Sequence, residues 1–205
     1  MLYRISTFLL SLVFRFTGGV TLIGRENIPR TGGVILAPNH ISYVDPPIVG
    51  CYLRRQVHYM AKEELFRSKL MAAWMRAVGT FPVRRGTADR KALKQAIDLL
   101  NQGRVVCIFP EGTRSPDGRL QEPELGIGLV ALKSQSPIVP VAVIGTDKVL
   151  PPGSKRLYRH RVRIVYGKPL TFLQPEQGRE SRQLLEEVGK ATMSAISELI
   201  SAHAS

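Results

Sequence analysis

The sequence contains few of the residues that stabilise a protein through cross-links or metal ions. It has only two cysteines, Cys51 and Cys107, which are too few for a disulfide framework or a cysteine metal site. The four histidines, His40, His58, His160 and His203, show no spacing typical of metal ligands. We therefore expect reduced thiols in a protein that faces the cytosol, no metal site and no cofactor.

Acidic residues are also scarce. The 205 residues include 16 Asp and Glu but 29 Lys and Arg, which gives a formal net charge of +13. Such an excess favours a phosphate-rich partner, either nucleic acid or an anionic membrane surface. No zinc-finger spacing, RNA-binding aromatic pattern or helix-turn-helix signature accompanies the charge. We therefore expect an anionic membrane surface as a partner and no nucleic acid.

The sequence also lacks an apolar run long enough to span a membrane, which takes about 20 residues. The apolar first sixteen residues include Arg15 and end at Thr17-Gly18-Gly19. Projected as a helix, they form a broad apolar face opposite a narrow polar stripe. The face comprises Leu2, Ile5, Leu9, Leu12, Val13 and Phe16, widened by Phe8, Leu10 and Phe14; the stripe comprises Arg4, Thr7, Ser11 and Arg15.

Residues 1–17 are therefore expected to form an amphipathic helix that lies in the membrane interface. A helix packed on the domain is an alternative. A signal peptide is less favoured because no small-x-small cleavage site follows.

Residues 18–205 are expected to form one domain, with no internal repeat. Strand patterns occur at 20–24, 33–37, 57–60, 80–83, 105–109, 138–144 and 161–166, and helix patterns at 45–54, 62–77, 87–100, 126–134 and 184–200. Thr87 is the expected cap of the third helix, and Pro140 suggests an irregular or edge position within its strand. The alternation predicts an α/β sandwich with a mixed, largely buried sheet flanked by helices.

His40 and Asp45 are the most informative pair of residues. An imidazole can take a proton from an alcohol near neutral pH, and a carboxylate on its far nitrogen fixes the tautomer. Residues five apart on one helix point about 140° away from each other, so contact requires a turn. Pro46-Pro47 predict that a helix begins at Asp45, with His40 on the loop before it. A capping box from Ser42 to Asp45, or an ordinary loop histidine, are the alternatives.

Four stretches, in this order, resemble the 1-acylglycerol-3-phosphate acyltransferase (PlsC-like) family of glycerolipid acyltransferases. The first is Asn39-His40-x-x-x-x-Asp45, and the third is Phe109-Pro110-Glu111-Gly112-Thr113-Arg114-Ser115. The second joins Ala61-Lys62-x-Glu64-Leu65 with Gly79-x-Phe81-x-Val83-x-Arg85, and the fourth is Ile138-Val139-Pro140-Val141-Ala142. The resemblance spans roughly residues 20–150, and the first and third stretches carry most of it.

The resemblance implies His40 as the catalytic base, Asp45 as the residue that orients it, and a substrate-binding set. That set is Lys62, Arg85, Glu111, Gly112, Thr113 and Arg114. Arg114 also follows a glycine on a loop, where a guanidinium can grip phosphate through two hydrogen bonds. Glu111 could instead pair with Arg114 or Arg85, and Lys62 could be a solvated helix end.

No serine or cysteine is placed as an obvious acyl-enzyme nucleophile. Ser42 is only two residues from His40, and Cys107 sits within a buried apolar run. Direct attack by the acceptor hydroxyl is therefore the simpler expectation.

The implied reaction moves an acyl group from acyl-CoA or acyl-carrier protein to the sn-2 hydroxyl of lysophosphatidic acid, giving phosphatidic acid. Arg84 stands where relatives often have Asp, and Glu124-Leu125 where they often have a basic residue. Both departures leave other acceptors open: glycerol 3-phosphate, another lysophospholipid or a lyso-aminolipid. A non-catalytic lipid-binding protein is a more distant alternative.

We expect peripheral, monotopic association with the cytoplasmic face of the cell membrane. Basic residues that could face the lipid, or bind an acidic acyl-carrier protein, are Arg54, Arg55, Arg67, Lys69, Arg76, Arg84, Arg85 and Arg90.

Overall fold

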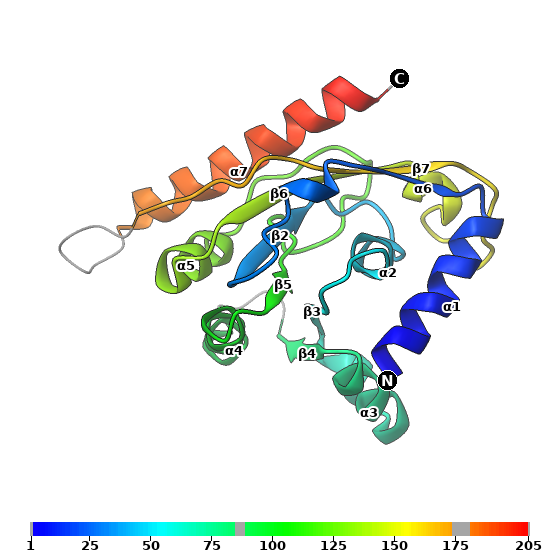
Figure 1. Ribbon diagram of the computed structural model, residues 1–205, viewed down its shortest axis with the longest axis horizontal. Coiled ribbons are helices and arrows are strands. Elements are labelled where there is room, and N and C mark those ends of the chain that lie inside the picture. Colours follow the sequence, from blue (N-terminus) through cyan, green and yellow to red (C-terminus); the bar gives the residue numbers. More distant parts are fainter. Residues whose placement is uncertain (1, 85–88, 174–180, 205) are drawn as a thin grey trace.

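A seven-stranded mixed sheet forms the centre of the molecule (Figure 1). The computed structural model describes residues 2–84, 89–173 and 181–204. Across the sheet the order is β1 (Val20–Ile23), β7 (Val162–Tyr166), β6 (Ile138–Ile144), β2 (Val34–Pro38), β5 (Val105–Cys107), β3 (Val57–Lys62) and β4 (Thr80–Val83). The five strands from β6 to β4 are parallel, whereas β7 runs antiparallel to β6 and pairs in parallel with β1. The mixed sheet expected from the sequence is confirmed.

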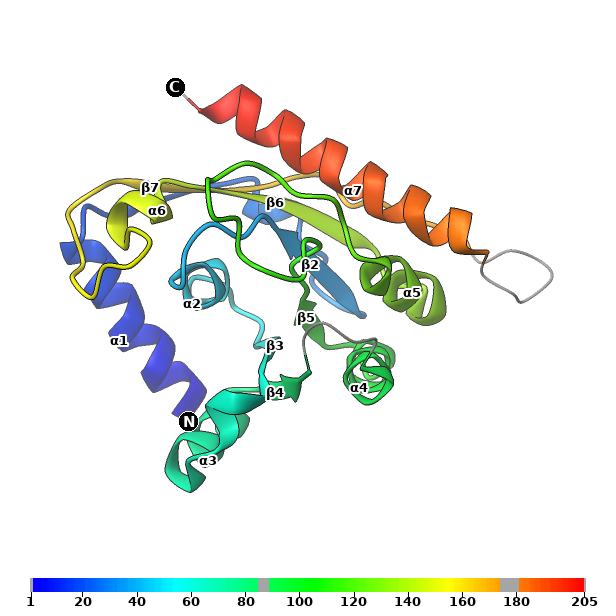
Figure 2. The same cartoon turned by 180° about the vertical axis from the view of Figure 1, so that it is seen from behind.

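Helices cover both faces of this sheet (Figures 1 and 2). On one side lie α1 (Leu2–Phe16) and α2 (Asp45–Cys51), and on the other α4 (Arg90–Asn101), α5 (Leu125–Ser134) and α7 (Arg182–His203). Shorter elements are η1 (Arg25–Asn27), η2 (Glu63–Phe66), α3 (Lys69–Ala77) and α6 (Thr146–Val149). At Gly128, where α5 packs on α7, an added Cβ would lie 2.6 Å from the carbonyl oxygen of Leu185, so only glycine allows this approach.

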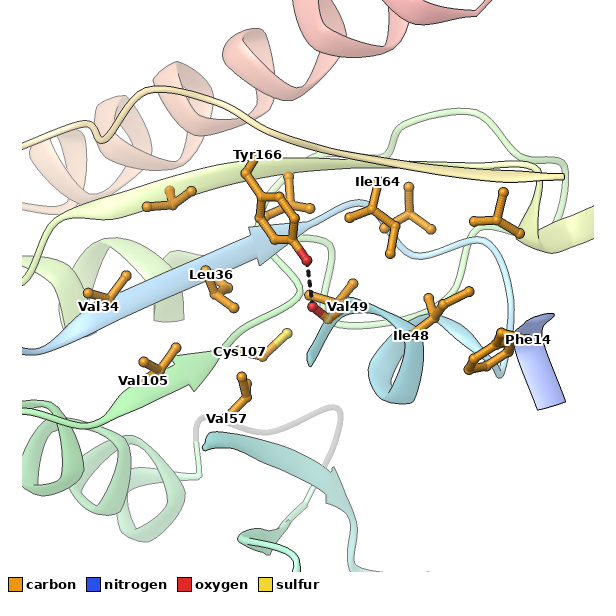
Figure 3. Packing of buried hydrophobic residues seen from close by; sticks show 14 of the residues in the cluster. Phe14, Val34, Leu36, Ile48, Val49, Val57, Val105, Cys107, Ile164 and Tyr166 are labelled. Atoms are coloured by element: carbon orange, nitrogen blue, oxygen red, sulfur yellow. Dashed lines mark hydrogen bonds between the residues drawn. The ribbon is translucent and has the colours of Figure 1, made fainter. Parts of the chain in front are cut away.

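Alternating residues of β2 divide the apolar core into two clusters. Val34 and Leu36 pack with α2, whereas Ile35 and Ala37 pack with α4 and α5. A strand buried on both faces in this way reads as a continuous apolar run, which is why β2, β5 and β6 were recognisable. The Tyr166 hydroxyl donates a 2.7 Å hydrogen bond to the carbonyl of Val49 and so holds α2 against the sheet (Figure 3).

The first helix packs on the domain with its less apolar side. Phe14 is buried in the cluster around Ile48 (Figure 3), Leu10 packs against the same cluster, and the Tyr3 hydroxyl accepts a 3.1 Å hydrogen bond from the Val57 amide. Thr7 and Ser11 can be half-buried because their hydroxyls bond to carbonyls of the helix itself. The helix itself was predicted correctly, but Leu10 and Phe14 face inward rather than widening the exposed face.

The expected helix over 62–77 is wrong at its start. Lys62 pairs with Val83 in the ladder between β3 and β4, so its backbone is extended. A short 3₁₀ helix, η2, follows, and α3 begins only after Ser68, whose hydroxyl accepts from the Met71 amide. The apolar periodicity runs across this break, which is why the sequence suggested one helix.

The start of α4 also differs from expectation. Asp89 caps this helix by accepting from the amides of Lys91 and Ala92, so the helix begins later than predicted. The expected cap, Thr87, lies outside the described residues.

Pro140 lies inside a central strand, contrary to the expected irregular or edge position. In β6 the odd-numbered residues bond to β2, as in the Asn39 amide to the Val141 carbonyl. Even-numbered residues face the other way, where Pro140 meets the end of β7 and accepts from the Gly167 amide. The missing N–H of Pro140 therefore costs the ladder with β2 nothing.

Candidate functional site

The proposed site residues come together because parallel strands end at one edge of the sheet. The loop carrying His40 follows β2, and the loop carrying residues 111–114 follows β5. Lys62 ends β3, which lies next to β5.

His40 and Asp45 contact each other directly. The Nδ1 atom of His40 lies 2.9 Å from Oδ2 of Asp45, and both side chains are buried, at 4% and 0% exposure. The ring of His40 stacks on Phe109 with centroids 4.1 Å apart. Since a carboxylate can only accept, it holds the proton on Nδ1 and leaves Nε2 as the basic nitrogen.

A tight turn makes this contact possible across five residues. Oδ2 of Asp45 accepts hydrogen bonds of 2.7 Å from the amides of both Ile41 and Ser42. Pro46 and Pro47 occupy the first turn of α2, which begins at Asp45. The Asp45 amide donates to the Ser42 carbonyl rather than to its hydroxyl, and Val44 is the cap residue of α2, so the alternative of a full capping box is wrong.

Asn39 fixes the point at which the chain leaves the sheet. Its side-chain amide donates to the Val143 carbonyl at 3.0 Å, and its side-chain oxygen accepts from the Val143 amide at 2.7 Å. The side chain thereby takes the place of the next residue pair in the ladder between β2 and β6. The loop that carries His40 therefore starts from a fixed position.

Glu111 braces the His40 loop. One carboxylate oxygen accepts from the His40 amide at 2.9 Å, and the other accepts from the Gln121 amide at 3.1 Å. Burial raises the pKa of this carboxyl, although the two amide hydrogen bonds oppose the shift. Glu111 is only 3% exposed and each carboxylate oxygen accepts one amide; its expected role as a substrate-binding residue stays a prediction.

Arg114 borders an open hollow of about 620 Å³. Thr113 and Gln121 also line it, and Arg119 adds a second cation. Gly112 precedes them with a φ of +67°, a backbone conformation that glycine adopts without strain. The guanidinium of Arg114 lies over the ring of Tyr43, 3.5 Å from its centre. Asp117, which pairs with Arg119 at 3.7 Å, also lines the hollow, so its lining has a net positive charge that suits an anionic group such as a phosphate.

The other expected cations are more exposed. Lys62 pairs with Glu64 at 3.2 Å and Arg84 with Glu63 at 3.1 Å, both on the surface. Lys62 is the last residue of β3 and the cap residue before η2, and its side chain is 54% exposed, which agrees with the alternative of a solvated helix end. Arg85, expected to bind phosphate, lies outside the described residues.

A second hollow of about 470 Å³ lies beside the loop that carries His40. Asn39 and Ile41, the two neighbours of His40, line it together with basic residues that include Lys148 and Arg161. Within residues 2–84, 89–173 and 181–204, no group of three or more His, Cys, Asp or Glu side chains is placed to hold a metal ion.

Three residues with structural roles at the site were not singled out from the sequence. Phe109 supports the imidazole, Tyr43 supports Arg114, and Gln121 contributes an amide to Glu111 and bonds through its side chain to the Arg114 carbonyl. Tyr43 lies between His40 and Asp45, and its place within this motif could have drawn attention to it. Gln121 belongs to none of the motifs, and nothing in the sequence pointed to it.

The chain is similar to known acyltransferases. A family model described as acyltransferase matches residues 19–144. The chain is 33% identical over 172 residues to a 1-acyl-sn-glycerol-3-phosphate acyltransferase of Bacillus subtilis (strain 168), covering 82% of each protein. It is 32% identical over 155 residues to the chloroplastic 1-acyl-sn-glycerol-3-phosphate acyltransferase LPAT1 of Arabidopsis thaliana, covering 74% of this chain and 43% of that protein.

A solved structure is similar as well. The crystal structure of the 1-acyl-sn-glycerophosphate acyltransferase PlsC from Thermotoga maritima matches with a TM-score of 0.71 and 29% sequence identity. The match covers 89% of this chain and 72% of that one.

Proposed function

The chain belongs to the acyltransferase family, and from this we propose that it transfers a fatty acyl group to the sn-2 hydroxyl of lysophosphatidic acid, giving phosphatidic acid. The contact between His40 and Asp45, on a loop that also touches Arg114 through Tyr43, is the observation that carries the proposal. The donor would be a thioester, either acyl-CoA or acyl-carrier protein.

His40 would act as the general base. The Nδ1–H group of His40 stays hydrogen-bonded to Asp45. Its Nε2 atom can therefore take the proton from the acceptor hydroxyl as the hydroxyl oxygen attacks the thioester carbonyl. The imidazolium that forms is stabilised by the carboxylate and can return its proton to the departing thiolate. Glu111 would keep the backbone of His40 in place, beside the acceptor that the family resemblance suggests it binds.

Direct attack by the hydroxyl is the route that the described residues support. Cys107 is buried, and burial raises the pKa of its thiol well above the ordinary value. Burial also raises the pKa of Cys51 to about 12. The Ser42 hydroxyl is bound to the Leu150 carbonyl. A radiolabelled acyl-protein trapped by rapid denaturation would contradict this route.

Arg114 would hold the phosphate of the acceptor, with Arg119, Thr113 and the backbone at Gly112 nearby. A guanidinium can donate two parallel hydrogen bonds to a phosphate, which fixes orientation as well as affinity. Lys62 and Arg85 are further phosphate contacts that the family resemblance suggests.

We also propose that α1 rests on the membrane. Its outward surface carries seven large apolar side chains, whereas a helix on a water-facing surface normally turns its apolar side inward. These exposed residues are Leu2, Ile5, Phe8, Leu9, Leu12, Val13 and Phe16. A surface of this kind suits the boundary between lipid headgroups and acyl chains. None of the described helices is long and apolar enough to cross a bilayer.

A basic loop next to the end of α1 supports the same orientation. The His160 amide bonds to the Thr17 carbonyl at 2.7 Å, which places this loop beside Phe16. Residues 148–173 contain no Asp or Glu. The loop exposes Lys155, Arg156, Leu157, Tyr158, Arg159 and Arg161. Cations near an anionic leaflet contribute about 1 kcal/mol each, so peripheral binding to the cytoplasmic face of the cell membrane is the location we propose.

A reconstitution experiment tests the function. Purified protein in liposomes receives lysophosphatidic acid with acyl-CoA or acyl-carrier protein, and mass spectrometry identifies the products. We expect phosphatidic acid from the wild type and a loss of about 10²–10⁴-fold in rate for His40→Ala, with membrane binding unchanged. His203→Ala, at the far end of α7, is the matched control and should retain the wild-type rate. Acylation of glycerol 3-phosphate but not of lysophosphatidic acid would overturn the proposed acceptor.

A further inference from the structure

Tyr43 is an exposed aromatic residue with a specific partner. It lies inside the turn that joins His40 to Asp45, and 67% of its surface is exposed. The guanidinium of Arg114 is centred 3.5 Å from the middle of its ring. An exposed tyrosine in a polar turn contributes little to the core, so this contact needs a different explanation.

The backbones on both sides of the contact are fixed. On the Tyr43 side, Asp45 binds the amides of Ile41 and Ser42, and its own amide donates to the Ser42 carbonyl at 3.3 Å. On the Arg114 side, the Ser115 amide donates to the His40 carbonyl at 2.8 Å. The main freedom left is therefore rotation of the long Arg114 side chain.

The ring of Tyr43 removes much of that freedom. A guanidinium that stacks on an aromatic face is held in one plane and keeps the N–H groups at its edge available. A phosphate bound at that edge would be positioned relative to Nε2 of His40, because the ring and the imidazole belong to one turn.

We propose that Tyr43 is a positioning residue for the phosphate of the acceptor: it holds the guanidinium of Arg114 in the orientation that binds this phosphate. The proposal rests on the proposed function. Tyr43 acts through the face of its ring, so its hydroxyl is dispensable.

Two variants separate the ring from its hydroxyl. Tyr43→Phe keeps the aromatic face, whereas Tyr43→Leu keeps apolar bulk without it. With a short-chain lysophosphatidate that stays monomeric, we expect Tyr43→Leu to raise KM about 2- to 5-fold with little change in kcat. Tyr43→Phe should keep the wild-type KM. Melting temperature and vesicle binding are measured for both variants.

The Arg114→Ala background is the decisive control. If Tyr43 acts through Arg114, adding Tyr43→Leu to Arg114→Ala should leave KM unchanged, because the two residues then share one effect. An equal rise in KM in both backgrounds would overturn the proposal, as would a loss confined to kcat. A change only in vesicle binding would instead assign Tyr43 to the lipid surface.

The same experiment separates this proposal from the proposed function. A wild type that does not acylate lysophosphatidate defeats both. A wild type that does so, with an unchanged KM in Tyr43→Leu, defeats the role of Tyr43 alone.

Discussion

The two halves of the proposed site are built in opposite ways. The half around His40, Asp45 and Glu111 is buried, and backbone amides hold both carboxylates. The half around Arg114 and Lys62 is more open to solvent and lies beside a hollow. The buried half is organised before substrate arrives, whereas the open half keeps its cations where a charged headgroup can reach them from solvent. Proton transfer needs fixed geometry, and binding a lipid from a membrane needs access.

Substitutions in the buried half should have the largest effect. Asp45→Asn retains an oxygen for the Ile41 and Ser42 amides but loses the charge that stabilises the imidazolium. We expect kcat to fall on the order of 10²–10⁴-fold while KM changes little. Steady-state kinetics measure this. Asp98→Asn, which breaks a surface ion pair with Lys94 on α4, is the control and should leave kcat and KM unchanged. A comparable rise in KM would mean that the two halves of the site do not act separately.

Removal of Arg114 should affect the open half in the complementary way. A hydrogen bond between charged groups contributes about 1.5–3 kcal/mol, so Arg114→Ala should lower kcat/KM about 10- to 100-fold, mainly through KM. Arg114→Lys should recover part of this loss, because it keeps the charge without the planar fork. Kinetics at several lysophosphatidate concentrations would show how much of the loss lies in KM and how much in kcat. An effect on kcat alone would place Arg114 with the buried half.

A substitution on α1 extends the comparison to the lipid surface. Leu9→Gln replaces an exposed apolar side chain and should weaken vesicle binding about 10-fold, with turnover of monomeric substrate unchanged. Leu173→Gln is the matched control, since Leu173 is 85% exposed and lies far from α1 in the sequence. Cosedimentation with anionic vesicles measures the binding. Equal losses from both variants would show that α1 has no special role.

The smallest expected effect is a pH dependence at Glu111. Burial raises the pKa of this carboxyl above its ordinary 4.5, so the folded chain binds this proton more tightly than the unfolded chain. The wild type should therefore lose stability relative to Glu111→Gln as pH rises from about 4.5 through the raised pKa. Urea unfolding of both proteins across this range measures the difference. A relative gain in stability would mean that the amide hydrogen bonds outweigh burial.

Much of the fold was predictable because its signals are local. The strands β2, β5 and β6 are continuous apolar runs, and Pro46-Pro47 mark the start of α2. The errors arose where tertiary pairing decides the structure. Pairing with β4 keeps the backbone of Lys62 extended, although the apolar pattern around this residue is typical of a helix. Pro140 is tolerated in the sheet only because β7 ends opposite it, and the length of a neighbouring strand cannot be read from β6.

For the candidate site, the turn between His40 and Asp45 could be predicted from the sequence, but most of the contacts could not. The spacing of His40 and Asp45 required a turn, and the structure contains one. The resemblance selected Glu111 as a residue of the site but not its partners, which are backbone amides of His40 and Gln121. Every residue except proline has an amide, so no sequence pattern identifies the ones that a carboxylate binds.

The side chain of Asn39 has a practical consequence for redesign. Because it clamps the end of β2 to β6 through two hydrogen bonds, changes made in the segment 116–120, between the two residues that bond to the His40 loop and to Glu111, should not propagate along β2 into the hydrophobic interior. A library that varies only that segment could search for enzymes with new headgroup preferences while every member inherits the same proton-transfer machinery.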